Sequence, residues 1–207
     1  MSDGEAAGEL KDADARVLAT LSEARAALDS LIADTSIRAS IVRAASVLAA
    51  ALTNRRRVFS CGNGGSMCDA MHFAEELSGR YRLNRPALAA VAISDPAHLT
   101  CVANDFGFDQ VFARFLQAHA AAGDCLLAIS TSGKSANVLE AARVARDASV
   151  TVIALTGRPG TPLGALADVE IATPSGPFAD RVQELHIKVI HILVELLERQ
   201  LFPALYP

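Results

Sequence analysis

Apolar residues recur at three- and four-residue spacing through the first part of the chain, the pattern of amphipathic helices. One such helix is predicted over residues 10–33, and a second follows the capping cluster Asp34-Thr35-Ser36 and runs to residue 54. Residues 1–9 are small and acidic, and they are predicted to form a flexible tail. The apolar faces of the two helices are expected to pack either against the rest of the domain or against a second subunit.

From residue 58 onward, short apolar runs alternate with helical patterns. Strands are predicted at 58–61, 87–93, 125–129, 151–155 and 169–172. Helices are predicted at 66–78, 97–103, 109–120, 136–148 and 179–201. This alternation is typical of an α/β fold, a five-stranded parallel sheet with helices on both faces in a flavodoxin-like, doubly wound order. We expect one domain at 10–202, including the N-terminal helices (10–54), and an extended C-terminal tail at 203–207.

The composition narrows the function classes. Of 207 residues, 51% are hydrophobic, enough for a sizeable core, and the net charge is −4. No basic cluster exceeds Arg55-Arg56-Arg57, so a nucleic-acid partner is not expected. The chain shows no signal-peptide pattern and no apolar run of membrane-spanning length, so we expect a cytoplasmic protein without a membrane partner. Cys61, Cys101 and Cys125 lie in apolar segments and are predicted to be buried, reduced thiols.

Two loops at the predicted carboxyl edge of the sheet have the composition of anion sites. The first contains Gly62, Gly64 and Gly65 and opens a helix; glycines allow close backbone approach, and a helix start offers free N–H groups. The second, Ser130 to Asn137, carries four hydroxyls around one glycine, more than capping a helix requires. Because ligands of such sheets bind beyond the carboxyl ends of the strands, the two loops together predict a phosphate site.

Candidate metal ligands lie on two predicted helices. His72 and Glu76 are four residues apart, so both project from one helix face, as in a two-ligand site for a borderline metal such as Zn²⁺. Gln183 and His191 lie on the last helix, but the apolar residues around His191 are equally typical of a packed core histidine, so spacing alone indicates only a weak site. Asn104-Asp105 fits either a loop cap or a binder of sugar hydroxyls.

Five sequence blocks, taken in order, resemble the phosphoheptose isomerases (sedoheptulose 7-phosphate isomerases) of the sugar isomerase (SIS) fold group. The blocks are Cys61–Ser66, His72–Leu77, Asn104–Phe108, Ile129–Gly133 and Arg181–His191. The hydroxyl loop is common to the whole fold group, whereas His72 and Glu76 together with Gln183 and His191 are more specific to these isomerases. Met67 departs from the family pattern, which often has histidine or a small residue there.

The resemblance implies an aldose–ketose isomerase that converts sedoheptulose 7-phosphate to D-glycero-D-manno-heptose 7-phosphate, the first step of ADP- or GDP-heptose biosynthesis for cell-surface glycans. It implies a homotetramer with active sites between subunits and one Zn²⁺ per subunit, held by His72, Glu76, Gln183 and His191. It also implies that the substrate is contacted by glycines and polar residues of several loops. These are Asn63, Gly64, Gly65, Glu76, Asn104, Asp105, Ser130, Thr131, Ser132, Ser135 and Gln183.

Such an isomerisation moves a proton between C1 and C2 through a cis-enediol, which requires a base near both carbons and an acid/base at the oxygens. We expect Glu76 to be the base and His191 the acid/base, although Glu76 could instead serve mainly as a metal ligand, with Asp180 sharing the proton transfer. Two other interpretations stay open. One is a non-catalytic SIS scaffold that binds a replication-initiator protein, although such relatives lack counterparts of Glu76 and His191. The other is a sugar-phosphate sensor, which the sequence does not separate from an isomerase.

Overall fold

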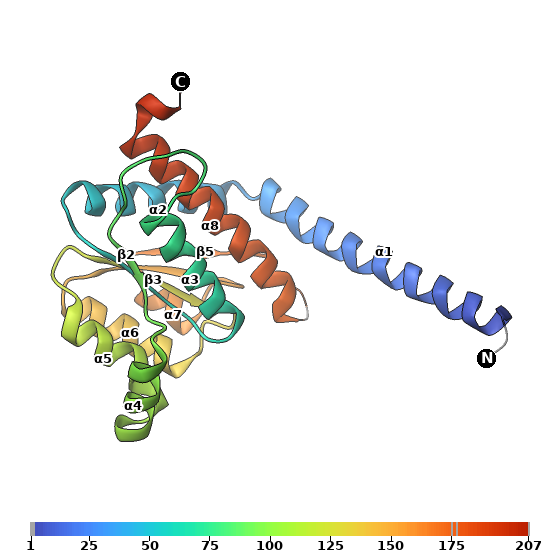
Figure 1. Cartoon of the computed structure of the whole chain (residues 1–207), viewed down its shortest axis with the longest axis horizontal. Helices are drawn as coiled ribbons and strands as arrows, with labels where there is room; N and C mark the ends of the chain where they lie inside the picture. The colour runs from blue at the N-terminus through green and yellow to red at the C-terminus, as the bar shows by residue number, and fades with distance from the viewer. Residues whose placement is uncertain (1–2, 175, 177, 207) are drawn as a thin grey trace.

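The central feature of the computed structural model, which describes residues 3–174, 176 and 178–206, is a parallel sheet between two layers of helices (Figure 1). Its strand order is β2-β1-β3-β4-β5. The strands are β1 (Val58–Cys61), β2 (Ala90–Ala92), β3 (Cys125–Ser130), β4 (Thr151–Thr156) and β5 (Val169–Ala172). The predicted fold class is therefore confirmed, and only β2 is clearly shorter than its predicted range.

The helices divide between the two faces of the sheet. On one face lie α1 (Asp3–Ala33), α2 (Thr35–Thr53), α3 (Gly65–Ser78) and α8 (Ala179–Leu201). On the other lie α4 (Pro96–Phe106), α5 (Val111–His119), α6 (Ala136–Asp147) and α7 (Pro162–Leu166). Short 3₁₀ turns follow α4 (Phe108–Gln110) and α8 (Pro203–Leu205).

The central strand β3 shows why the sheet needs both layers. Every residue of β3 is buried. Leu127 and Ile129 join the core under α2, α3 and α8, whereas Leu126 and Ala128 join the core under the opposite helices. A continuous apolar run is what a parallel strand covered on both faces requires.

The structure corrects three predictions. Residues 3–9, predicted to be a tail, belong to α1, because alanine and glutamate extend a helix once it is nucleated. The C-terminal tail is not extended throughout: residues 203–205 form a 3₁₀ turn, and the hydroxyl of Tyr206 returns to Glu198. Cys101 is exposed rather than buried, because Val102 alone of the α4 side chains is buried. Cys61 and Cys125 are buried as predicted.

Two N-terminal helices differ in their surroundings. α1 extends away from the domain and touches it only near its C-terminal end (Figure 1), where Leu31 enters the core. By length and composition alone, α2 is apolar enough to cross a membrane, but its residues Ala44, Ala45 and Leu48 are fully buried in the core.

Candidate active site

In the glycine loop between β1 and α3, backbone conformation and close packing both require glycine. Gly64 is the N-cap of α3 and has φ +55°, a left-handed conformation that glycine adopts without strain. A Cβ at Gly62 would lie 2.6 Å from the carbonyl oxygen of Ser66. A Cβ at Gly65 would lie 2.6 Å from Nε2 of Gln183, so α8 packs directly against the first turn of α3. Ligand contacts of Gly64 and Gly65 remain a prediction.

The hydroxyl loop after β3 is organised by its own side chains. Oγ of Ser130 lies 3.0 Å from Oγ of Ser135 and accepts a hydrogen bond of 3.1 Å from the N–H of Gly133. Oγ of Ser132 accepts one of 3.2 Å from the N–H of Lys134. Ser135 is the N-cap residue of α6, yet its side chain makes no capping hydrogen bond. Helix capping therefore does not account for this hydroxyl, which leaves the anion-binding interpretation favoured.

A hollow of about 230 Å³ opens beside the hydroxyl loop. Its lining includes Thr131 and Ser132 of the loop, Arg158 after β4, and Phe178 and Val182 at the start of α8. The hydroxyls and the arginine give this hollow the hydrogen-bond donors and positive charge that a phosphate requires.

A pair of asparagines joins the two predicted anion loops. Nδ2 of Asn63 donates to Oδ1 of Asn137 at 2.9 Å, and Nδ2 of Asn137 donates back to Oδ1 of Asn63 at 2.8 Å. Asn137 is buried in the first turn of α6. The reciprocal pair fixes the orientation of the Asn63 amide and brings the loops after β1 and β3 together, as the sequence predicted.

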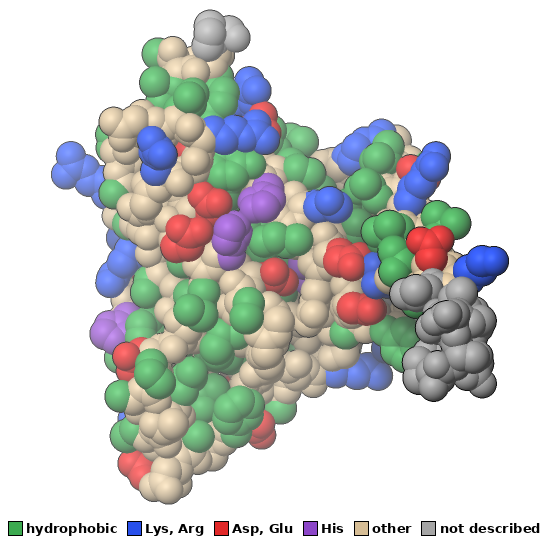
Figure 2. All heavy atoms as spheres, turned by 45° about the vertical axis from the view of Figure 1, so that its right-hand side comes forward, with side chains coloured by type: hydrophobic (Ala, Val, Ile, Leu, Met, Phe, Trp, Pro, Cys, Tyr) green, Lys and Arg blue, Asp and Glu red, His purple; other side chains and the backbone are tan. Residues whose placement is uncertain are grey.

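A His/Glu/His cluster lies where α3 faces α8. Nε2 of His72 is 2.9 Å from Nε2 of His191 and 3.3 Å from Oε1 of Glu76. All three side chains are partly buried. Figure 2 shows two histidine side chains side by side at the surface with acidic side chains next to them. The structure thus unites His72, Glu76 and His191, and it makes His191 a surface-accessible ligand candidate rather than a core histidine.

The cluster fits a divalent cation. One donor atom from each residue lies within 4.8 Å of the others. Tetrahedral Zn²⁺ places nitrogen and oxygen ligands roughly 3.4 Å apart, close to the separations around His72. Burial lowers the pKa of His191, and the charge of His72 lowers it further, which favours the neutral imidazole that binds metal. Oε1 of Glu75 lies 3.4 Å from Nδ1 of His72, which favours a proton on Nδ1 and leaves Nε2 free to ligate.

Two predicted site residues lie away from the His72, Glu76 and His191 cluster in this chain, and a third lies beside the glycine loop. The amide of Gln183 lies against Gly65 in the first turn of α3, the helix that carries His72 and Glu76, and its role as a metal ligand remains a prediction. Asn104 and Asp105 are exposed on α4, on the opposite face of the sheet, where Nδ2 of Asn104 donates to Oδ1 of Asp105 at 2.7 Å. Asn104 and Asp105 are therefore separated from the cluster within one polypeptide.

Two residues near the cluster were given no role by the sequence analysis. Asp69 is buried on α3, and burial raises its pKa to about 6. The sequence feature that could have identified Asp69 is its position on the apolar stripe of α3, three residues before His72, where a carboxylate is unusual. The ring of Tyr81 lies 5.9 Å from that of His191; Tyr81 comes from an irregular segment whose path the sequence pattern does not determine.

Comparison with known proteins decides the family. The SIS domain family matches residues 21–157. The phosphoheptose isomerase of Aeromonas hydrophila is 54% identical over 181 residues, which cover 87% of this chain and 94% of that protein. The chain belongs to the phosphoheptose isomerase family.

Solved structures of this family have the same fold. The phosphoheptose isomerase of Neisseria gonorrhoeae has a TM-score of 0.83 and 40% identity, covering 89% of this chain and 98% of that one. A phosphoheptose isomerase of Francisella tularensis has a TM-score of 0.85 and 32% identity, covering 90% and 98%. The resemblance seen in the sequence blocks is therefore confirmed.

Proposed function

We propose that this protein is a cytoplasmic, metal-dependent isomerase that converts sedoheptulose 7-phosphate to D-glycero-D-manno-heptose 7-phosphate, the first step toward ADP- or GDP-heptose. The observation that carries the proposal is the cluster of His72, Glu76 and His191 in a chain of this family. Family membership supports the substrate class. The cluster favours an enzyme over a non-catalytic SIS scaffold, because a scaffold does not need a group of metal-binding side chains.

The proposed proton transfers use two residues of the cluster. The carboxylate of Glu76 removes the proton from C1 of the open-chain ketose and returns it to C2, and His191 moves a proton between the two oxygens. A bound divalent cation, proposed to be Zn²⁺ with Gln183 as its fourth ligand, supplies Lewis acidity at the carbonyl. In this structure the Gln183 amide is placed beside the glycine loop, which also favours a substrate contact.

The phosphate end of the substrate is proposed to bind the hydroxyl loop. Ser130, Thr131, Ser132 and Ser135 supply hydroxyls there, and the Asn63–Asn137 pair holds the glycine loop beside them. Anchoring a remote phosphate allows its binding energy to orient the reacting carbons.

We further propose that a homotetramer completes the site. Asn104 and Asp105 lie on the face of the sheet opposite the cluster, so neighbouring subunits would bring the parts together.

The first experiment is turnover of sedoheptulose 7-phosphate by purified protein, before and after chelation and with Zn²⁺ restored. The proposal expects conversion that chelation abolishes and Zn²⁺ restores. No conversion with intact sugar-phosphate binding would favour the sensor, and neither binding nor conversion would favour the scaffold.

A substitution then tests the proposed base. Glu76→Gln keeps the side-chain shape but removes the base, and we expect kcat to fall by about 10³-fold while the sugar phosphate still binds. Glu140→Gln removes the same charge from a partly exposed position on α6, on the opposite face of the sheet, and serves as the control. Turnover of Glu76→Gln near that of the control would contradict the role of Glu76.

A further inference from the structure

A buried ion pair joins the end of α3 to the end of α8. Nε of Arg85 lies 2.8 Å from Oε1 of Glu198, and both side chains are 0% exposed. Arg85 comes from the long connection between α3 and β2, and Glu198 comes from the last turn of α8. Replacing a buried pair by apolar residues is often neutral or stabilising, so stability alone is a weak reason for such a pair.

The remaining nitrogens of Arg85 bind carbonyl oxygens at the C-terminus of α3. Nη2 donates to the carbonyl of Glu76 at 2.6 Å. Nη1 donates to the carbonyls of Leu77 at 2.7 Å and Gly79 at 3.2 Å. The last carbonyls of a helix lack intrahelical partners, and a positive charge there interacts favourably with the helix dipole. Arg85 is therefore a side-chain cap on the turn that carries Glu76.

Glu198 is fixed from its other side as well. The hydroxyl of Tyr206 hydrogen-bonds to Oε2 of Glu198. Burial and this hydrogen bond raise the pKa of Tyr206 to about 12, so the hydroxyl is a donor at neutral pH. Near Glu198 on α8, Glu195 pairs with Arg82 of the same connection at 2.7 Å. Two ion pairs, Arg85–Glu198 and Arg82–Glu195, thus hold the connection after α3 against α8.

These contacts adjoin the metal-binding cluster. Glu76 is on the capped turn of α3, and His191 lies seven residues, about two turns, before Glu198 on α8. We propose that Arg85 and Glu198 are positioning residues, which set the spacing of α3 and α8 and with it the placement of Glu76 relative to His191. The proposal rests on the proposed function of the cluster.

The test replaces the pair without leaving a buried charge. The double variant Arg85→Met/Glu198→Leu keeps apolar bulk in the site and is expected to fold. Co²⁺ alone is the probe of the cluster, followed by its visible absorption spectrum. We expect the Kd for Co²⁺ to rise at least 10-fold and the visible spectrum of bound Co²⁺ to change. We also expect kcat for sedoheptulose 7-phosphate to fall at least 10-fold, while KM stays within 2-fold of the wild-type value. Arg85→Lys, which keeps the charge but not the multiple hydrogen bonds, should lie between wild type and the double variant.

A control separates positioning from general destabilisation. Asp124 is buried just before β3, where it accepts hydrogen bonds from the N–H groups of Arg57 at 2.8 Å and Ala121 at 2.9 Å and contacts neither α3 nor α8 through them. Asp124→Asn should lower stability without changing Co²⁺ affinity.

Wild-type Co²⁺ affinity, spectrum and kcat in the double variant would overturn the positioning role. Wild-type protein that binds Co²⁺ without turnover would overturn the proposed function alone, because Co²⁺ affinity still reports the effect of the pair. Wild-type protein that binds no Co²⁺ would overturn both.

Discussion

At the residue scale, two buried side chains, Asp69 of α3 and His186 of α8, have opposite titration behaviour. Among the described residues, Oδ2 of Asp69 and Nδ1 of His186 are the buried side-chain atoms without a hydrogen-bond partner. Burial raises the pKa of Asp69 to about 6, and burial lowers the pKa of His186 to about 4. Both shifts arise because removing water disfavours the charged form, so both side chains are neutral between these two values.

The pKa shifts of Asp69 and His186 therefore predict opposite effects of pH on the free energy of unfolding. The folded state holds the proton of Asp69 more tightly than the unfolded state, so stability is lost as pH rises from 3.8 to about 6. The folded state holds the proton of His186 less tightly, so stability is lost as pH falls from 6.5 to about 4. Relative to wild type, Asp69→Asn should gain up to about 3 kcal/mol by pH 7, and His186→Gln should gain most near pH 4.

The measurement is urea unfolding of the chelated protein between pH 4 and 7. The two variants act as controls for each other, because each removes one titration and leaves the other. Free-energy curves of both variants that run parallel to the wild-type curve would contradict the predicted pKa shifts.

The site was partly predictable at this scale. The spacing of His72 and Glu76 predicted their shared helix face, because that relation is local to one helix. His191 was only a weak candidate from spacing, since its role depends on how α8 packs against α3. The cap formed by Arg85 was not predictable, because its partners belong to α3 and α8 while Arg85 lies in an irregular connection.

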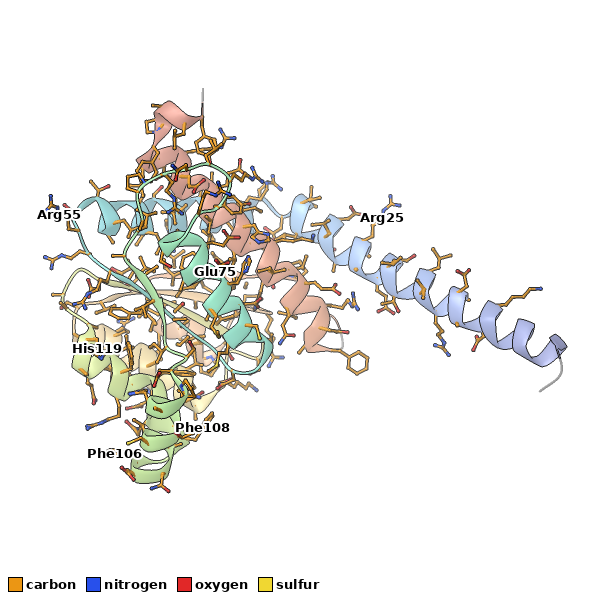
Figure 3. The ribbon with its side chains drawn as sticks, in the orientation of Figure 1. Arg25, Arg55, Glu75, Phe106, Phe108 and His119 are labelled. Carbon is orange, nitrogen blue, oxygen red and sulfur yellow. The ribbon has the colours of Figure 1, made fainter. Side chains whose placement is uncertain are left out.

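At the element scale, two helices end in a left-handed residue that is not glycine. Arg55 after α2 and Ser149 after α6 both have φ +56°, and Arg55 lies in the turn between α2 and β1 (Figure 3). After α6, the N–H of Ser149 binds the carbonyl of Arg146 and the N–H of Val150 binds that of Ala145, the Schellman pattern. Glycine is usual at this position because other residues are strained there.

This geometry predicts a stabilising substitution. Ser149→Gly should raise the free energy of unfolding by about 1 kcal/mol, because it removes the steric strain of a Cβ in the left-handed conformation. Ser149 is exposed, so little packing is lost. Ser149→Ala keeps the Cβ and is the matched control. Equal urea midpoints for the glycine and alanine variants would contradict the strain argument.

The elements differ in how far the sequence determines them. β1 and β5 have the predicted bounds, because their apolar runs are bracketed by polar or glycine-rich turns. α7 was not predicted: its five residues form no periodic pattern, and its start depends on Thr161, whose Oγ1 accepts from the N–H of Gly164 at 3.0 Å. The 3₁₀ turn at 203–205 brings Tyr206 back to Glu198 in the last turn of α8, and this reversal has no periodic pattern in the sequence.

At the scale of the whole molecule, two groups of exposed apolar side chains lie close together on single elements or on adjacent ones. On α1, Val17, Leu18 and Leu21 are exposed along one helix face, where α1 extends beyond the domain (Figure 1). At the far end of α4, Phe106 and the adjacent Phe108 are exposed and lie near each other (Figure 3). Exposed apolar patches of this kind mark association surfaces, which supports the proposed homotetramer.

The stripe on α1 gives the last prediction. Leu18→Glu/Leu21→Glu places two charges on that face, and burying them between subunits would be unfavourable. We expect the assembly to dissociate and turnover to fall, while the domain stays folded because its core begins at Leu31. Ala19→Glu adds a charge on the opposite face of α1 and is the control. Light scattering after size exclusion gives the mass and circular dichroism the fold; a dissociated variant with full turnover would show that one subunit contains the complete site.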